Sequence, residues 1–159
     1  MEEYLKTERS QPWREELRGT AKNAQRVKRE RVVMPEQDPV ARAANNEEVN
    51  LGLSSKQAVE EAYRCLDCKD PTCINGCPVN VNIPKFVKLI EIGMFLEAAI
   101  TLKETNTLPA VCGRVCPQEV QCEQTCFYAQ KLKKPAVAIG YLERFTADYE
   151  RASGKISVP

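Results

Sequence analysis

Eight cysteines in two short runs are the residues in this sequence best able to do chemistry. Closely spaced thiols of this kind form disulfides or bind metal. In each run, one cysteine is followed directly by proline. The first run, RCLDCKDPTCINGCPVN over residues 64–80, contains Cys65, Cys68, Cys73 and Cys77. The second run, VCGRVCPQEVQCEQTC over residues 111–126, contains Cys112, Cys116, Cys122 and Cys126.

Composition narrows the chemistry that these thiols can do. The sequence has no histidine, which removes mixed cysteine–histidine zinc sites, Cys-His nucleophile pairs and Ser-His-Asp triads. Its polar start lacks the hydrophobic region of a signal peptide, and no apolar run approaches the roughly 18 residues of a membrane span. We therefore expect a cytoplasmic protein that does not contact a membrane. In that compartment clustered thiols more often bind metal than form disulfides.

Other ligand classes have little support in the sequence. The net charge is +1, so there is no general attraction for nucleic acid or for an anionic surface. The glycines form neither a G-x-G-x-x-G motif nor a phosphate-binding loop. We therefore expect no nucleotide site and no nucleic-acid partner.

Three uses of the cysteines compete: disulfides, zinc and iron–sulfur clusters. Eight thiolates could form two tetrahedral zinc sites, but such sites usually show matched C-x2-C pairs, and only Cys65 and Cys68 have that spacing. Bacterial ferredoxins bind [4Fe–4S] clusters with a C-x2-C-x2-C-x3-C-P run whose fourth cysteine ligates the other cluster. The first run here reads C-x2-C-x4-C-x3-C-P. Its spacing favours two [4Fe–4S] clusters over a zinc-stabilised interaction module without a redox role.

Helical patterns flank the first cysteine run. Ser54 and Gln57 have capping-box spacing at the start of a helix that leads to Cys65. After the run, Asn82 can cap a second helix, with a proline in its first turn and Gly93 at its end. We therefore expect the first run to form a loop between two helices.

Helices are also expected on both sides of the second run. One contains Phe95 and Leu102 and ends before the segment NTLPA. Another, within residues 135–154, presents one apolar side made by Ile139, Leu142, Phe145 and Tyr149. No segment shows a sustained period of two. The predicted class is all-α, with two cysteine loops held between helices.

We divide the sequence into three parts. Residues 1–33 form a highly charged N-terminal arm, residues 34–150 the helical domain and residues 151–159 a linker. Within the arm, basic residues recur every three or four positions from Arg18 to Arg29, which would gather them on one side of a helix. We expect a solvated helix; docking of this basic side on an acidic partner or on nucleic acid is the alternative. Residues 32–52 read as an extended connector with one short helical turn.

Four longer motifs surround or contain the cysteines: EQDPVARAANNEEVNLG, EEAYRCLDCKDPTCINGCPVNVNIPKF, ETNTLPAVCGRVCPQEVQCEQTC and AVAIGYLERF. On these motifs, the stretch from about Met34 to Ala147 resembles the N-terminal iron–sulfur domain of the NADPH-dependent glutamate synthase small (beta) subunit. Dihydropyrimidine dehydrogenase and the large subunit of NADH-dependent ferredoxin:NADP oxidoreductase begin with the same domain. The resemblance implies an α-helical ferredoxin-like fold with two [4Fe–4S] clusters.

The resemblance also implies which residues bind each cluster. A Glu or Gln in a G-x-L-[EQ] stretch replaces one cysteine in the family, and that position here is Glu143. Cys112 would then not be a ligand. Gly140, one helical turn earlier, would let the backbone approach a bulky cluster. Without the resemblance, Glu143 would read as an exposed carboxylate beside Arg144. The implied ligands are Cys65, Cys68, Cys73 and Cys126 for cluster one, and Cys77, Cys116, Cys122 and Glu143 for cluster two.

Electron transfer is the function that the resemblance implies. In the glutamate synthase relatives, NADPH reduces FAD on the small subunit, and electrons cross iron–sulfur clusters to a large subunit that makes glutamate. A G-x-G-x-x-G segment begins, in the relatives, shortly after the point matching GKISVP. We therefore expect a flavin and NADPH domain to follow this one in a parent enzyme. The 159 residues themselves contain no group placed for acid–base or nucleophilic catalysis.

Overall fold

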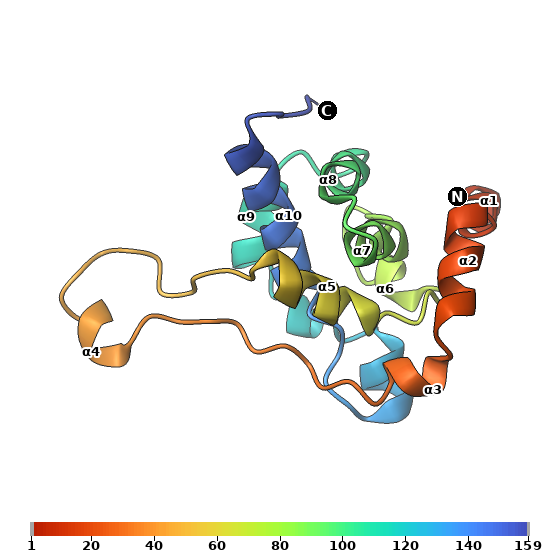
Figure 1. The fold of residues 1–159 in the computed structure, drawn as a ribbon, viewed down its shortest axis with the longest axis horizontal. Helices are drawn as coiled ribbons and strands as arrows, with labels where there is room; N and C mark the ends of the chain where they lie inside the picture. Colours follow the sequence, from red (N-terminus) through yellow and green to blue (C-terminus); the bar gives the residue numbers. More distant parts are fainter. Residues whose placement is uncertain (1, 159) are drawn as a thin grey trace.

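The structure, a computed structural model, describes residues 2–158 and is built from helices (Figure 1). No strand occurs in that range, so the predicted all-α class is confirmed. None of the helices described is long and apolar enough to pass through a membrane. The α-helices are α1 (Glu2–Arg9), α2 (Pro12–Thr20), α3 (Asn23–Arg26), α4 (Pro39–Arg42), α5 (Ser55–Tyr63), α6 (Thr72–Asn75), α7 (Ile83–Glu91), α8 (Phe95–Lys103), α9 (Pro109–Val115) and α10 (Ile139–Ser153).

Two shorter turns complete the second cysteine loop. A 3₁₀ turn spans Gln118–Val120 and a π-helical turn spans Tyr128–Leu132. The first run lies between α5 and α7, as predicted. The second run begins inside α9, a helix that was not predicted and that contains Cys112, and it ends before α10. Residues 1 and 159, which the sequence assigns to the arm and to the linker, lie outside the described residues.

Helix α5 begins where its capping pattern predicts. The Ser54 hydroxyl accepts a hydrogen bond from the Gln57 backbone N–H at 3.3 Å, and the Gln57 side chain accepts one from the Ser54 N–H at 3.0 Å. This reciprocal pair satisfies two N–H groups that the first helical turn would otherwise leave without partners. The cap fixes where α5 starts, and Cys65 follows two residues after α5 ends at Tyr63.

Helix α7 supplies the centre of the core. The Asn82 side chain caps it by accepting from the Lys85 N–H at 3.3 Å, and Pro84 lies in the first turn, where a missing N–H costs nothing. Phe86 and Ile90 are 1% and 0% exposed. Helices α5 and α8 pack on α7, and α10 crosses α5, α8 and α9 (Figure 1). The core therefore lies where α5, α7, α8 and α10 meet.

The approach of α9 to α10 depends on Gly113. A side chain at Gly113 would collide with the backbone of Arg144, so only glycine lets the two helices come this close. Aromatic rings hold α8 against α10. The ring of Phe95 packs edge to face against that of Phe145, with the ring centroids 5.1 Å apart, and its centroid lies 4.8 Å from that of Tyr149. The predicted apolar side of the last helix is thus confirmed.

A buried ion pair joins α5 to the start of α10. Glu61 is fully buried, and its Oε1 accepts from Arg64 at 2.6 Å and from the Ala138 N–H at 2.8 Å. Its Oε2 accepts from the Val32 N–H at 2.7 Å. Arg64 also donates to the carbonyl of Ala136 at 2.9 Å. Three segments far apart in the sequence are therefore held together by one carboxylate and one guanidinium group.

The N-terminal helices lie against the body, which corrects the prediction of a solvated helix. Arg14 and Arg26 are each 2% exposed. Arg26 donates to the Glu91 carboxylate at 2.8 Å and to the Tyr63 carbonyl at 2.7 Å. The prediction failed because Arg26 has partners on α5 and α7 and Arg14 has one in the first cysteine loop, which spacing within the arm cannot reveal.

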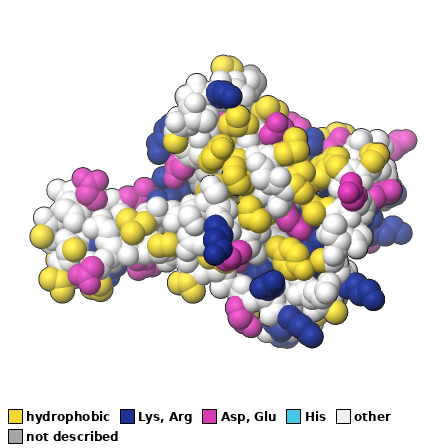
Figure 2. Space-filling model, viewed as in Figure 1, with side chains coloured by type: hydrophobic (Ala, Val, Ile, Leu, Met, Phe, Trp, Pro, Cys, Tyr) yellow, Lys and Arg dark blue, Asp and Glu magenta, His cyan; other side chains and the backbone are white. Residues whose placement is uncertain are grey.

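A hairpin formed by residues 36–50 projects from the body (Figure 1), and Figure 2 shows it as a separate lobe. An isolated bridge between Glu36 and Asn50 closes its base. Its tip contains α4, capped by the Asp38 side chain, which accepts from two backbone N–H groups. Val40 at the tip is 81% exposed. This matches the predicted extended connector with one short helical turn.

Removing the carboxylate of Glu61 should destabilise the fold strongly. In Glu61→Ala the Arg64 guanidinium stays buried without its counter-charge, and we expect the free energy of unfolding to fall by about 3–5 kcal/mol. Chemical denaturation followed by circular dichroism measures this. Glu60→Ala, at an exposed position one residue earlier, is the matched control and should change stability by less than about 0.5 kcal/mol. Similar small losses for both variants would contradict the role given to Glu61.

Candidate metal centres

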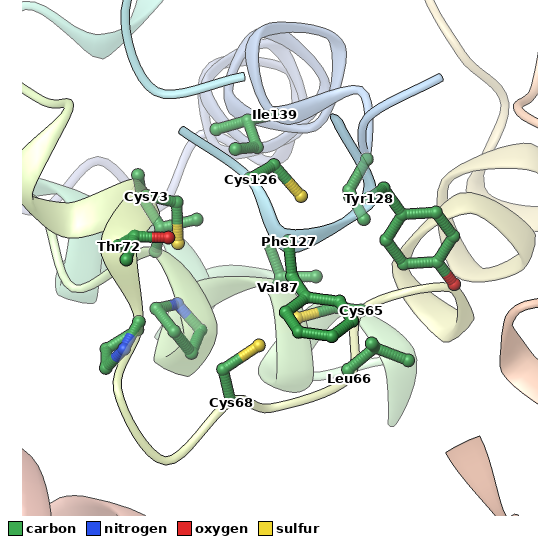
Figure 3. Close-up of a pocket in the computed structure, with 14 residues that line it drawn as sticks. Cys65, Leu66, Cys68, Thr72, Cys73, Val87, Cys126, Phe127, Tyr128 and Ile139 are labelled. Atoms are coloured by element: carbon green, nitrogen blue, oxygen red, sulfur yellow. The ribbon is translucent and has the colours of Figure 1, made fainter. Parts of the chain in front are cut away.

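Four of the cysteines line one apolar pocket. Figure 3 shows their sulfur atoms directed toward a common space, which Phe127 also lines. Three come from the first run, and the fourth is brought from the second run at the start of the π-helical turn. Apolar side chains of α7 and α10, among them Val87 and Ile139, form the walls. The cysteines are Cys65, Cys68, Cys73 and Cys126, the set predicted for cluster one.

Burial makes the thiols of Cys65, Cys68 and Cys73 hard to ionise. It raises the pKa of Cys68 to about 12 and that of Cys73 well above its usual range, and the neighbouring thiols raise both further. A thiolate there therefore needs a positive charge nearby. A bound metal supplies that charge, and its binding releases the thiol protons. Soft thiolates in an apolar pocket are a donor set that suits iron–sulfur clusters.

A second group combines both runs with α10. Cys77 and Glu143 lie close enough to Cys116 and Cys122 to act on both thiols electrostatically. Burial is the largest cause that raises the pKa of Cys116 to about 11 and that of Cys122 to about 12. Cys112 is the next cause for Cys116 and Glu123 for Cys122, and Cys77 and Glu143 raise both pKa values further. The structure thus brings together the four side chains predicted for cluster two.

The two groups are neighbours in space. Cys122 of the second group is one of the thiols that raise the pKa of Cys73 in the first. A cubane cluster is larger than one ion, so its ligands stand farther apart than those of a single-ion site. No three Cys, Asp or Glu side chains within residues 2–158 have the arrangement that holds one metal ion.

Glu143 is mostly withdrawn from water and faces the second group. Burial raises the pKa of its carboxyl to about 7, partly offset by a hydrogen bond from Asn106 at 2.7 Å. Its neighbour Arg144 is turned away, with ion pairs to Glu48 at 3.2 Å and Asp148 at 3.4 Å. The interpretation of Glu143 as an exposed carboxylate beside Arg144 is therefore wrong.

Gly140 lies close to the second cysteine loop. A side chain at Gly140 would collide with the amide of Gln118, which donates to the Cys112 carbonyl at 3.0 Å. Gly140 therefore lets the 3₁₀ turn of that loop lie against α10, and the expected approach of its backbone to a cluster stays a prediction.

Cys112 lies next to the second group. It acts on Cys116 through its charge and through a side-chain hydrogen bond, and both effects raise the pKa of Cys116. Its own thiol donates to the Asn106 side-chain oxygen at 3.5 Å. Cys112 and Glu143 thus both stand beside Cys116, and the assignment of Glu143 as the ligand stays a prediction.

Asp67 fixes the first cysteine loop and was missed from the sequence. It lies between Cys65 and Cys68 in the left-handed backbone region, with φ of 49°, and is 1% exposed. Its carboxylate pairs with Arg14, and with Arg18 at 2.5 Å. The arginine spacing in the arm was the available signal, but nothing in the sequence identifies which carboxylate the arm meets.

Glu123 fixes the second loop in a similar way. It lies between Cys122 and Cys126, which belong to different groups. Arg31 donates to one of its oxygens at 2.7 Å, and the Gly140 N–H donates to the other at 3.3 Å. The segment that contributes to both groups is thereby tied to the N-terminal arm and to α10.

The comparison with protein families defines the class of this protein. Residues 42–155 match the family described as dihydropyrimidine dehydrogenase domain II, 4Fe-4S cluster. That is most of the chain, and the chain belongs to this family. The resemblance inferred from the cysteine motifs is confirmed, and [4Fe–4S] binding is the metal chemistry of the family.

Particular relatives are subunits of oxidoreductases. The glutamate synthase [NADPH] small chain of Escherichia coli is 45% identical over 101 residues, covering 64% of this chain and 21% of the relative. The protein of that name from Halomonas elongata is 40% identical, covering 76% and 25%. The NAD-dependent dihydropyrimidine dehydrogenase subunit PreT of E. coli is 40% identical, covering 68% and 26%. The chain thus spans about a fifth to a quarter of these relatives.

Neutralising Asp67 should loosen the first cysteine loop. In Asp67→Asn, Arg14 and Arg18 lose a buried charge partner, while asparagine still tolerates the left-handed backbone. Charge-assisted hydrogen bonds contribute about 1.5–3 kcal/mol each, so amide exchange of residues 65–73 should accelerate about 10- to 100-fold. Asp70→Asn, at an exposed position in the same loop, is the control and should leave exchange unchanged. Equal exchange in the two variants would show that the arm does not hold the loop.

Proposed function

We propose that this domain holds two [4Fe–4S] clusters and transfers electrons through them. Cluster one is assigned to Cys65, Cys68, Cys73 and Cys126, and cluster two to Cys77, Cys116, Cys122 and Glu143. The convergence of the first four thiols on one apolar pocket is the observation that carries this proposal. Each group takes side chains from both runs, as in ferredoxins, where one run supplies ligands to two clusters.

The protein's own residues would do three things for the clusters. Apolar walls such as Val87 and Ile139 exclude water from the first group. The ion pairs of Asp67 and Glu123 hold the two loops in place. The carboxylate of Glu143 adds a hard negative ligand to one group only, so the two reduction potentials should differ. The bound clusters supply one-electron transfer, and the adjacency of the groups supports electron passage between them.

A parent oxidoreductase would supply the remaining chemistry. The names of the relatives support an enzyme of the NADPH-dependent glutamate synthase or NAD-dependent dihydropyrimidine dehydrogenase type. FAD and NADPH would be bound by a domain that follows this one, and a large glutamate synthase-type subunit or another acceptor would receive the electrons. We place this enzyme in the cytoplasm, where the thiols remain reduced before the clusters are loaded.

Metal content tests the proposal directly. Protein purified or reconstituted without air should contain close to eight irons and eight acid-labile sulfides per chain, as two cubanes require. It should be brown, and its reduced form should give two EPR signals. Two zinc ions without labile sulfide in the same anaerobic preparation would support a zinc-stabilised module and end the electron-transfer proposal.

Substitutions separate Glu143 from Cys112 as the eighth ligand. Cys116→Ser and Glu143→Ala should each disrupt cluster two, with loss of iron and of its EPR signal, and spare cluster one. Glu143→Gln should be milder, because an amide oxygen can still ligate, and should raise the reduction potential, since one negative charge is lost. Cys112→Ser should leave both clusters intact. Loss of a cluster in Cys112→Ser, with no effect of Glu143→Ala, would assign the position to Cys112.

A further inference from the structure

A buried asparagine connects Glu143 to the helix that leads to Cys116. Asn106 is 6% exposed and lies between α8 and α9. Its Nδ2 donates to Glu143 Oε1 at 2.7 Å. Its Oδ1 accepts from the Leu108 N–H at 3.0 Å, just before α9 begins. One amide therefore touches both the carboxylate on α10 and the start of α9.

The chemistry of its partners fixes the orientation of this amide. The Leu108 backbone N–H can only donate, so the amide oxygen must face it. The nitrogen then faces Glu143, whose ionised carboxylate can only accept. Turning the amide over would place its NH2 group against the Leu108 N–H and its oxygen against the Glu143 carboxylate, and neither hydrogen bond could form. The donation to Glu143 is thus required by the bond to Leu108.

The bond leaves one carboxylate oxygen available. Within residues 2–158, Glu143 has no ion-pair partner, and Asn106 is the group that donates to its side chain. With Oε1 engaged, Oε2 is left to bind a metal. The Cys112 thiol donates at 3.5 Å to Asn106 Oδ1, the oxygen that also accepts from the Leu108 N–H. The amide therefore also contacts Cys112, the other candidate for the eighth ligand.

We propose that Asn106 is a positioning residue for cluster two. It holds Glu143 by Oε1 so that Oε2 faces the metal. This inference rests on the ligand assignment in the proposed function. Groups that hydrogen-bond to metal ligands orient them, and their loss typically costs about 10- to 100-fold in metal affinity. The N–H of Asn106 also draws negative charge from the ligand, which favours the reduced, more negative cluster.

The test replaces Asn106 in the full chain, with clusters reconstituted without air. Asn106→Ser keeps a hydroxyl that can accept from the Leu108 N–H but is too short to reach Glu143. Asn106→Asp keeps the shape and the acceptor but replaces the donor with a second acceptor. In both variants we expect cluster two to lose iron to a chelator about 10- to 100-fold faster. Its midpoint potential in an EPR titration should fall, while cluster one stays unchanged.

Asn82→Ser is the matched control. Asn82 is also 6% exposed and also caps a helix, by accepting from the Lys85 N–H. Its amide nitrogen has no hydrogen-bond partner in the described part of the chain, so serine removes no donor contact there. We expect this variant to lose stability without a change in the potential of cluster two. An equal change of potential in both asparagine variants would reduce Asn106 to a structural cap and overturn the proposal.

A comparison with Glu143→Ala separates the two assignments. A normal cluster two in both Asn106 variants, beside a disrupted one in Glu143→Ala, would overturn the positioning role and leave the ligand set standing. A normal cluster two in Glu143→Ala would overturn the ligand assignment itself, and the inference with it.

Discussion

The buried carboxylate of Glu61 is the constraint on which the rest of the structure depends. It accepts hydrogen bonds from Arg64 on its own helix end, from the Val32 N–H in the connector and from the Ala138 N–H before α10. Replacing such a pair by apolar groups can be neutral, but losing one member leaves an uncompensated charge. The pair therefore specifies the arrangement: it sets α5, which leads to the first cysteine loop, against α10, which presents Glu143.

The two candidate centres differ in what surrounds them. The first lies among apolar side chains of α7 and α10, and its loop is fixed from outside by the Asp67 carboxylate and two arginines of the arm. The second includes a carboxylate and adjoins a polar network through Asn106. Reduction potential depends on ligand charge, hydrogen bonds and exposure. Under the proposed ligand sets, the two clusters would therefore differ in reduction potential.

Capping patterns and helical periodicity, which act within a few residues, predicted much of the fold. They did not predict the contacts between segments that are far apart in the sequence. The capping box at Ser54 and the cap at Asn82 act within one turn, and the apolar side of α10 follows from helical periodicity. The arm was different, because Arg14 and Arg26 are placed by carboxylates far away in the sequence. Asn106 carries no local pattern at all. The ligand sets came from family resemblance, since spacing alone left zinc and iron–sulfur chemistry open.

The division of each group between two runs has a consequence for the order in which the protein is made. Under the proposed ligand sets, the ribosome releases Cys65, Cys68 and Cys73 well before Cys126, and Cys77 well before Glu143. The nascent chain would therefore expose free thiols, which are open to oxidation, until residues 126 and 143 have emerged. Cluster two could not be completed before α10 has emerged. Under these ligand sets, chains that end before Glu143 would be unable to hold cluster two.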